Sequence, residues 1–309
     1  GGRGITGADT KDGDFIERLI LADNKDFLLI FTTWGWVHWL KVYKVPELGR
    51  NSLGRFIENL IPLREAEGDD GRGKEGIASI IPVSEFAPDQ FLCTVSRGGY
   101  VKKTSLQDYS RPKRGGIIGA GLKDGDTLVR AVLTNGETDL MVSTTQGQTI
   151  RFAEGDVRGM GRSAAGVIAV KFKKQADHVV DMVVADDDAM LLSVCENGYG
   201  MRTRMADYPK KNRGGMGVVN VKGLARNGEV VLVRRINEGD DVILMSEGGT
   251  LIRTSGDEIR LVGRGAAGVR VMRLKADDKV ASAVVVQPEE SAVDPEGPAA
   301  EESDDDAPE

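Results

Sequence analysis

Residues 191–219 read LLSVCENGYGMRTRMADYPKKNRGGMGVV. The stretch holds an apolar run, the dipeptide Asn197-Gly198, a second strand-like run and a basic, glycine-rich segment. Asn-Gly between two strand-like runs is a strong sequence signal for a β-hairpin. The stretch therefore predicts a hairpin followed by a basic segment, called here the return segment.

The same pattern recurs along the chain, and its phase is kept. Steps of 51 residues from Gly198 reach Gly147 and Gly249, and earlier steps of 48 and 64 reach Gly99 and Gly35. Four residues after these glycines the first copy has Trp39 and the others have a cation: Lys103, Arg151, Arg202 and Arg253. Nine residues after the last four glycines stands an acid: Asp108, Asp156, Asp207 and Glu258. The return segments keep Arg162, Arg213 and Arg264 in register, followed by Gly166, Gly217 and Gly268. Such a repeat predicts an array of equivalent supersecondary units.

Each unit has the strand content of one propeller blade. An entry strand, such as 76–83 or 179–184, precedes a hairpin, a return segment and a short apolar run such as 166–172 or 268–274. About four strands in ~50 residues is typical of a β-propeller blade. In the first unit we expect strands at 15–21, 27–32 and 37–45. We predict an all-β domain over residues 1–286, with a flexible insertion at about 64–76.

The charge of the chain is divided unevenly. The formal net charge is −7, but ten of the 48 acids lie in residues 289–309, which contain no base. Residues 1–288 then carry 38 acids against 41 bases, about +3. The composition of residues 287–309 predicts a disordered acidic tail.

Several classes of protein are disfavoured by the sequence. Cys93 and Cys195 lie in apolar runs and are expected to be buried, reduced thiols. No apolar run approaches the length of a membrane span, and no signal peptide is visible. The chain begins with Gly1, and we expect it to be a fragment. Its two histidines, His38 and His178, have no ligand-spaced partners, and no nucleophile motif or P-loop is present. We therefore expect no metal site, no cofactor and no catalytic site in this chain.

The repeated cations point to a polyanion instead. In a ring of blades, residues at the same position in each repeat lie at the same radius and height. The repeated cations would therefore form a belt around the rim. Phosphate contacts from such a belt give affinity without sequence information. Trp34, Trp36 and Trp39 are expected to fill the core, with a stacking platform for bases as the alternative. The predicted DNA-binding residues are Arg3, Lys41, Arg50, Arg55, Lys102, Lys103, Arg111, Lys113, Arg114, Arg151, Arg158, Arg162, Arg202, Arg204, Lys210, Lys211, Arg213, Arg253, Arg260 and Arg264.

Specific motifs support a family resemblance over essentially the whole chain. They are VYKVPE at 42–47, GRFIENLIPL at 54–63, IIPVSEF at 80–86, ENGYGMRTRMADYP at 196–209 and VGRGAAGV at 262–269. With the acidic tail, they resemble the C-terminal domain of the DNA gyrase A subunit. That family has a basic box of Gln-Arg-Arg-Gly-Gly, a Lys or Arg, and Gly. Gly1, Gly2, Arg3 and Gly4 resemble its second half.

The resemblance implies a six-bladed β-pinwheel of four-stranded antiparallel blades, here lacking part of the first blade. It also implies a non-catalytic module that wraps double-stranded DNA and supports ATP-dependent negative supercoiling by a type IIA topoisomerase. The implied partners are the B subunit together with the N-terminal part of the A subunit, in an A2B2 holoenzyme that uses ATP and Mg elsewhere. The implied location is the bacterial cytoplasm, at the nucleoid. Apart from the resemblance, the charge of the acidic tail leaves two roles open: a solubilising appendage, or a competitor for the cationic belt within the same chain that salt would screen.

Two alternatives remain at this point. The C-terminal domain of the topoisomerase IV A subunit has a similar pinwheel without an intact box. A propeller that binds protein partners would use its cations for solubility only.

Overall fold

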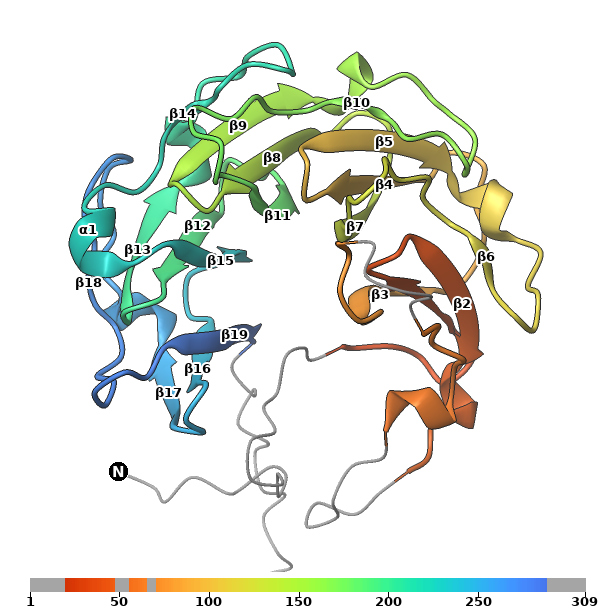
Figure 1. The fold of residues 1–309 in the computed structure, drawn as a ribbon, viewed down its shortest axis with the longest axis horizontal. Helices are drawn as coiled ribbons and strands as arrows, with labels where there is room; N and C mark the ends of the chain where they lie inside the picture. The colour runs from red at the N-terminus through yellow and green to blue at the C-terminus, as the bar shows by residue number, and fades with distance from the viewer. Residues whose placement is uncertain (1–19, 48–55, 66–70, 288–309) are drawn as a thin grey trace, which may run out of the picture.

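A computed structural model describes residues 20–47, 56–65 and 71–287 of the chain. In these residues five antiparallel sheets, called blades 1 to 5 in chain order, stand one after another along an arc (Figure 1). Short strands lie on the outside of the arc, and longer strands lie on its inside (Figure 1).

Each blade is built on one hairpin, as the repeat predicts. The hairpins are β1 (Phe27–Thr32) and β2 (Trp36–Lys41), β4 (Phe91–Ser96) and β5 (Tyr100–Ser105), β8 (Asp139–Thr144) and β9 (Gln148–Ala153), β12 (Met190–Cys195) and β13 (Tyr199–Arg204), and β16 (Asp241–Ser246) and β17 (Leu251–Ser255). An inner strand pairs with the first strand of each hairpin: β3 (Ile77–Val83), β7 (Leu128–Thr134), β11 (Val179–Val184), β15 (Val230–Ile236) and β19 (Val280–Val286).

The outer strands are exchanged between neighbouring units. β6 (Ile117–Ile118) follows β5 in the chain but pairs with β2 of the preceding blade, Val37 opposite Ile117. In the same way β10 (Val167–Ile168), β14 (Val218–Val219) and β18 (Val269–Arg270) complete blades 2, 3 and 4. The predicted unit is therefore not a blade, because its fourth strand belongs to the blade before it.

The expected count of six blades is not what the described residues form. They contain five hairpins, and a blade cannot form without its hairpin, so the sheets number five. Blade 5 has three strands among these residues, and the outer edge of β17 has no strand partner within 20–47, 56–65 and 71–287. The partial box at Gly1, Gly2, Arg3 and Gly4 lies outside the described residues, as do most of strand 15–21 and all of the predicted tail except Gln287.

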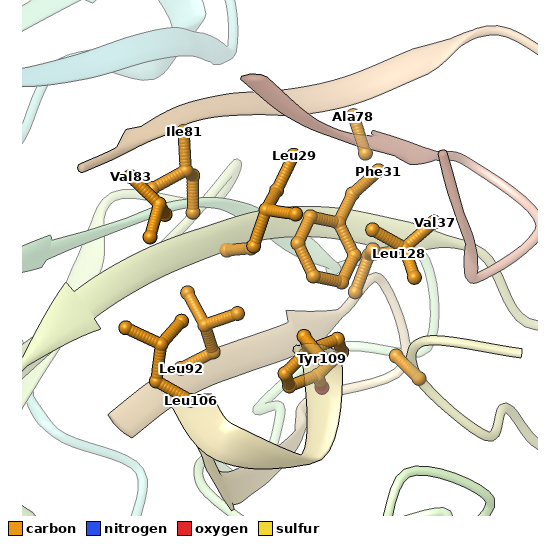
Figure 2. Packing of buried hydrophobic residues seen from close by; sticks show 12 residues of the cluster. Leu29, Phe31, Val37, Ala78, Ile81, Val83, Leu92, Leu106, Tyr109 and Leu128 are labelled. Carbon is orange, nitrogen blue, oxygen red and sulfur yellow. The ribbon is translucent and has the colours of Figure 1, made fainter. Parts of the chain in front are cut away.

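The hydrophobic core lies between successive blades rather than within one. Leu29 and Phe31 of blade 1 pack against Leu92 of blade 2 and against Tyr109, which lies in the following return segment (Figure 2). Alternate residues of a strand face opposite sides of its sheet, and both sides of an internal blade are covered. This explains why the central strands read as continuous apolar runs, such as MLLSVC in β12.

Helical structure is confined to short turns. A 3-10 helix begins seven residues after each hairpin glycine: η1 (Val42–Lys44), η3 (Leu106–Tyr109), η4 (Glu154–Asp156), η5 (Met205–Asp207) and η6 (Gly256–Glu258). The predicted strand 37–45 accordingly ends at Lys41, where η1 begins. The remaining helices are η2 (Ile57–Asn59) and α1 (Leu224–Asn227). Near η2, Ile61 packs on Ile30 and Leu40 and covers the face of blade 1 that is turned away from blade 2.

The hairpin glycines are required by backbone geometry and by the next blade. Gly198 has φ +78°, a conformation that favours glycine. A Cβ atom there would lie 2.4 Å from the carbonyl oxygen of Met272, in the segment that leads to the inner strand of blade 5. Glycine thus allows two neighbouring units to approach closely.

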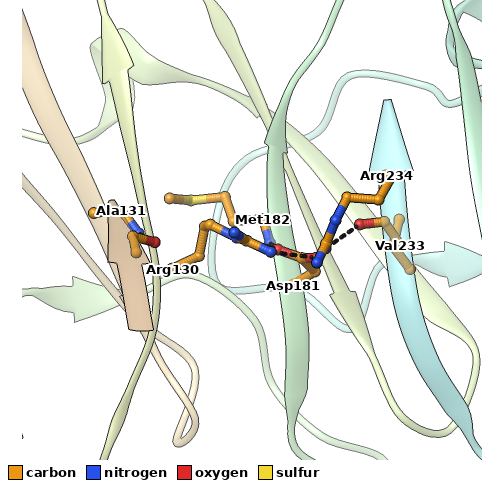
Figure 3. A network of polar contacts seen from close by, with 7 residues as sticks. Arg130, Ala131, Asp181, Met182, Val233 and Arg234 are labelled. Atoms are coloured by element: carbon orange, nitrogen blue, oxygen red, sulfur yellow. Dashed lines mark hydrogen bonds and ion pairs between the residues drawn. The ribbon is translucent and has the colours of Figure 1, made fainter. Parts of the chain in front are cut away.

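The inner strands are joined by an ion cluster centred on the buried Asp181. Asp181 on β11 accepts bonds from Arg130 Nε on β7, at 2.7 Å, and from Arg130 Nη2, at 3.0 Å (Figure 3). It also accepts a bond from Arg234 Nη1 on β15. The cluster therefore connects blades 2, 3 and 4 on the inside of the arc.

Candidate nucleic-acid interface

The return segments occupy the outside of the arc. Residues 106–118, 154–168, 205–219 and 256–270 each run from a 3-10 helix to an outer strand on the preceding blade (Figure 1). Each reaches that blade through a glycine: Gly217 has φ +68°, and a Cβ atom there would lie 2.5 Å from the carbonyl oxygen of Thr149. This close approach fixes the return segment, and with it the basic residues, on the rim.

Half of the predicted DNA-binding side chains are exposed, on or beside the return segments. They are Arg111, Lys113, Arg114, Arg158, Arg204, Lys210, Lys211, Arg253, Arg260 and Arg264. Two of them have neighbouring acids: Lys210 pairs with Asp139 at 2.7 Å, and Arg253 pairs with Asp241 at 2.7 Å. These ten residues are called the rim cations below.

Other predicted residues are withdrawn from the surface. Lys103 and Arg202 are 9% and 6% exposed. The Arg151 side chain pairs with Asp139 at 2.9 Å and with Asp187 at 2.6 Å. The side chain of Arg202 pairs with Asp257 at 2.6 Å. Lys103 Nζ donates to the carbonyl oxygen of Glu154 at 3.3 Å. In blades 2 to 4 the cation at the repeated position therefore has protein partners, and these three cations do not form an exposed belt.

Lys102 is the most buried of the predicted cations. Its Nζ donates to the carbonyl oxygen of Gly119 at 3.1 Å and to that of Arg162. Burial, with a smaller contribution from the nearby Arg162 guanidinium, lowers the pKa of Lys102 to about 7. This residue ties two return segments together.

The return-segment arginines have both a structural contact and remaining exposure. Arg213 Nε donates to the carbonyl oxygen of Asp156 at 3.0 Å, and Arg264 Nε donates to that of Asp207 at 3.1 Å. Each bond joins a return segment to the 3-10 helix of the blade before it. Arg162 is half-buried.

The remaining predicted DNA-binding residues are Lys41 and three arginines outside the described residues. Lys41 Nζ lies 3.4 Å from the centre of the Phe27 ring and donates to the carbonyl oxygen of Lys25. Arg3, Arg50 and Arg55 lie outside the described residues.

The tryptophans of blade 1 pack within the protein. Trp34 is buried, and the Arg64 guanidinium lies 3.3 Å from the centre of the Trp36 ring. Trp39 Nε1 donates to the carbonyl oxygen of Tyr109 at 2.8 Å. Of the predicted insertion, Glu75 is buried and accepts a hydrogen bond from Thr32 Oγ1, so this end of the segment is attached to blade 1.

Sequence reasoning missed two charged groups. The Arg130–Asp181–Arg234 cluster could have been noticed, because Arg130 and Asp181 are one period of 51 residues apart. Arg226 and Arg270 flank the Tyr199 ring, with their guanidinium carbons 4.2 and 5.4 Å from its centre. They add a basic patch near the hairpin turn of blade 4.

The two cysteines lie inside the described blades. Cys93 and Cys195 are buried free thiols, as expected, and burial raises the pKa of each to about 12. Within residues 20–47, 56–65 and 71–287, three or more potential metal ligands do not gather at any point. The helices of the described segments are all too short to cross a membrane.

Comparison with known proteins identifies the family. The DNA gyrase C-terminal domain, a β-propeller, matches the chain over six segments: residues 1–23, 26–57, 90–135, 138–186, 190–237 and 240–287. The chain belongs to this family. The last five segments of this gyrase domain each begin eight or nine residues before a hairpin glycine, so the family pattern and the internal repeat coincide.

The relatives of this gyrase domain include DNA gyrase A subunits of several bacteria. The one from Escherichia coli (strain K12) is 38% identical over 312 residues, covering 100% of this chain and 35% of the relative. The one from Haemophilus influenzae is 37% identical over 309 residues, covering 91% of this chain and 34% of the relative. The chain thus spans about a third of the length of these relatives.

Solved structures agree on the fold. A DNA gyrase A C-terminal domain matches with a TM-score of 0.72 at 23% identity, covering 91% of this chain and 92% of that one. The C-terminal domain of DNA topoisomerase IV matches with a TM-score of 0.74 at 26% identity, covering 85% and 80%.

Proposed function

We propose that this chain binds double-stranded DNA without sequence preference along its outer rim and bends it around the arc of blades. The observation that carries the proposal is the position of the rim cations. They are exposed, and they recur at the return segment of each of blades 2 to 5, on the outside of the arc.

A series of cations suits a long polyanion better than a small ligand. Bending a duplex sharply costs roughly 1–10 kcal/mol, so several contacts must share that cost. Lysine and arginine side chains that neutralise phosphates release counterions, and this supplies affinity independent of sequence. Successive blades turn the rim, so a duplex that touches several of them must follow the curve.

In the cell, this module would be the DNA-wrapping part of a gyrase A subunit. It would present a second DNA segment to the gate formed by the rest of that subunit, in a holoenzyme with the B subunit. Cleavage chemistry, ATP and Mg would belong to those other parts, and supercoiling would occur at the nucleoid. The relatives among DNA gyrase A subunits support this assignment over topoisomerase IV, whose C-terminal domain has a similar fold.

The test is the salt dependence of binding to a mixed-sequence linear duplex. The triple variant Arg111→Gln, Lys113→Gln and Arg114→Gln removes three exposed cations from one return segment. Because each phosphate contact contributes about 0.9 to the slope of log K against log salt, we expect the slope to fall by roughly 2–3.

The matched control removes three exposed lysines elsewhere. Lys123, Lys173 and Lys174 lie in the loops before the inner strands β7 and β11, and Lys174 Nζ donates to Gln146 Oε1 at the hairpin turn, away from the 3-10 helices. Their replacement by Gln should leave the slope unchanged. Equal effects of the two triple variants, or binding of the unsubstituted chain that does not depend on salt, would contradict the proposal.

A further inference from the structure

The residue four places after each hairpin glycine has the same contact in four blades. Its side chain donates an N–H to a main-chain carbonyl oxygen in, or directly after, the 3-10 helix of the next unit. The pairs are Trp39 Nε1 to Tyr109 at 2.8 Å, Lys103 Nζ to Glu154 at 3.3 Å, Arg151 Nη1 to Met205 at 3.2 Å and Arg202 Nε to Ile259 at 2.7 Å. These four residues are called latch residues below.

The main chain of the same position also holds the next blade. The carbonyl oxygen of Lys103 accepts from the Met160 amide at 2.8 Å, and that of Arg151 accepts from the Lys211 amide at 2.8 Å. The carbonyl oxygen of Arg202 accepts from the Val262 amide at 2.9 Å. At this repeat position the side chain and the main chain of one residue therefore both bond to the same return segment of the next unit.

The common property of the latch residues is an N–H donor rather than a charge. Trp39 is neutral, yet its indole N–H makes the same contact that cations make in the later blades. Burial supports this view, because the Arg202 side chain is 7% exposed and its three donor nitrogens already bond to Ile259 and Asp257. So little of this side chain is exposed that it offers almost no surface to a phosphate.

Blade 5 provides an internal comparison. Among the described residues no unit follows it, and Arg253, at the latch position, pairs with Asp241 of its own hairpin. The Arg253 side chain is 51% exposed. The buried state of the other cations therefore depends on the presence of a following blade.

We propose that Trp39, Lys103, Arg151 and Arg202 are positioning residues that fix the angle between successive blades, and thereby the curvature of the DNA path, without contacting phosphate. Small rotations at each junction add along the arc, so weakening one latch changes the path that the rim cations define. The DNA part of this inference rests on the proposed function, whereas the contact between blades does not.

The experiment compares three substitutions in the whole chain. Trp39→Phe keeps the aromatic packing and removes the N–H without changing charge. Arg202→Met keeps the aliphatic part of the side chain and removes its donors. Arg253→Met is the matched control, since it removes the same charge at the same repeat position where no acceptor from another blade is present among the described residues.

The first readout is hydrogen exchange of the protein alone. In Arg202→Met the Val262 amide should exchange about tenfold faster, the effect of roughly one net hydrogen bond on an opening equilibrium. Arg253→Met should leave this rate unchanged. Arg202→Lys should recover part of the protection, because Lys103 makes the contact with a single amine in blade 2.

The second readout separates wrapping from affinity. Nicked circular DNA is ligated in the presence of each variant, and the linking-number shift per bound domain is measured beside the salt slope of binding. We expect Trp39→Phe and Arg202→Met to reduce the shift with an unchanged slope, and Arg253→Met to lower the slope by about 0.9.

Two results would overturn the inference. One is an unchanged linking-number shift in both Trp39→Phe and Arg202→Met. The other is unchanged exchange of Val262 in Arg202→Met together with a lower salt slope, as a phosphate ligand would give. If the unsubstituted chain binds DNA without any shift, the proposed function fails, and the exchange rates alone then support or overturn the latch.

Discussion

Replacement of Asp181 by Asn should strongly destabilise the protein, because this buried carboxylate is the shared ion-pair partner of two arginines on the inside of the arc. Its side chain is 2% exposed, and those of Arg130 and Arg234 are 18% and 25% exposed. Removing one member of a buried ion pair costs about 3–5 kcal/mol, because the remaining charge is left uncompensated. Since both arginines keep some contact with water, we expect the lower end, about 3 kcal/mol, or roughly two powers of ten in the folding equilibrium.

The assay is urea unfolding followed by far-UV circular dichroism, and the control lies one residue from Arg234. Arg235 pairs with Asp186 at 2.6 Å, but the two side chains are 45% and 34% exposed. Loss of such a surface pair costs about 0–1 kcal/mol, so Arg235→Gln should unfold close to the unsubstituted chain. Equal losses of stability in Asp181→Asn and Arg235→Gln would refute the reasoning.

A compensated variant tests the same reasoning from the other direction. Apolar side chains of similar volume can replace a buried ion cluster at little cost. The triple variant Asp181→Leu, Arg130→Met and Arg234→Met should therefore be more stable than Asp181→Asn alone. A triple variant that is less stable than the single one would show that the cluster contributes by more than charge compensation.

Three other sites give predictions of their own. The pKa of Lys102 is about 7 in the folded chain, against an ordinary value of 10.5. Between these two pH values the unfolded state binds more protons than the folded state, so the free energy of unfolding rises with pH. The variant Lys102→Met should lose this rise in urea midpoints measured from pH 7 to pH 9, and an unchanged rise would contradict the lowered pKa. Gly217→Ala should cost about 2 kcal/mol or more, because of its positive φ and its close approach to Thr149, whereas Gly155→Ala, which meets open space, should stay within about 0.5 kcal/mol in the same assay. Deletion of residues 289–309 should tighten DNA binding at low salt and lose its effect as salt screens the tail; identical salt titrations would exclude competition by the tail.

The sequence predicts much of the local structure because the signals for it are local. Strand β1 has the expected bounds, 27–32, and the hairpin turn falls at Asn197-Gly198, because strand and turn propensities act over a few residues. The exchange of outer strands could not be predicted. From sequence alone, Val218 and Val219 could pair with the hairpin of their own unit or with that of the preceding unit. Which hairpin they pair with depends on how whole units pack against each other.

The burial of the cations at the repeated position was not predicted either, although two features of the sequence indicate it. Arg202 lies between Met201 and Thr203 in a strand whose two faces are both covered, which leaves little room for a solvated guanidinium. Trp39 replaces the cation in the first copy, which shows that charge is not essential at this position. The exposure of Arg253 could not be foreseen, since it depends on which residues pack against blade 5.

The most direct test of the account is ligation of a nicked circular DNA in the presence of increasing amounts of this polypeptide, with subsequent separation of the topoisomers. Chiral wrapping around the rim predicts a linking-number shift that grows with protein until binding saturates. Saturated binding with an unshifted topoisomer distribution would contradict the claim that the arc of blades bends DNA.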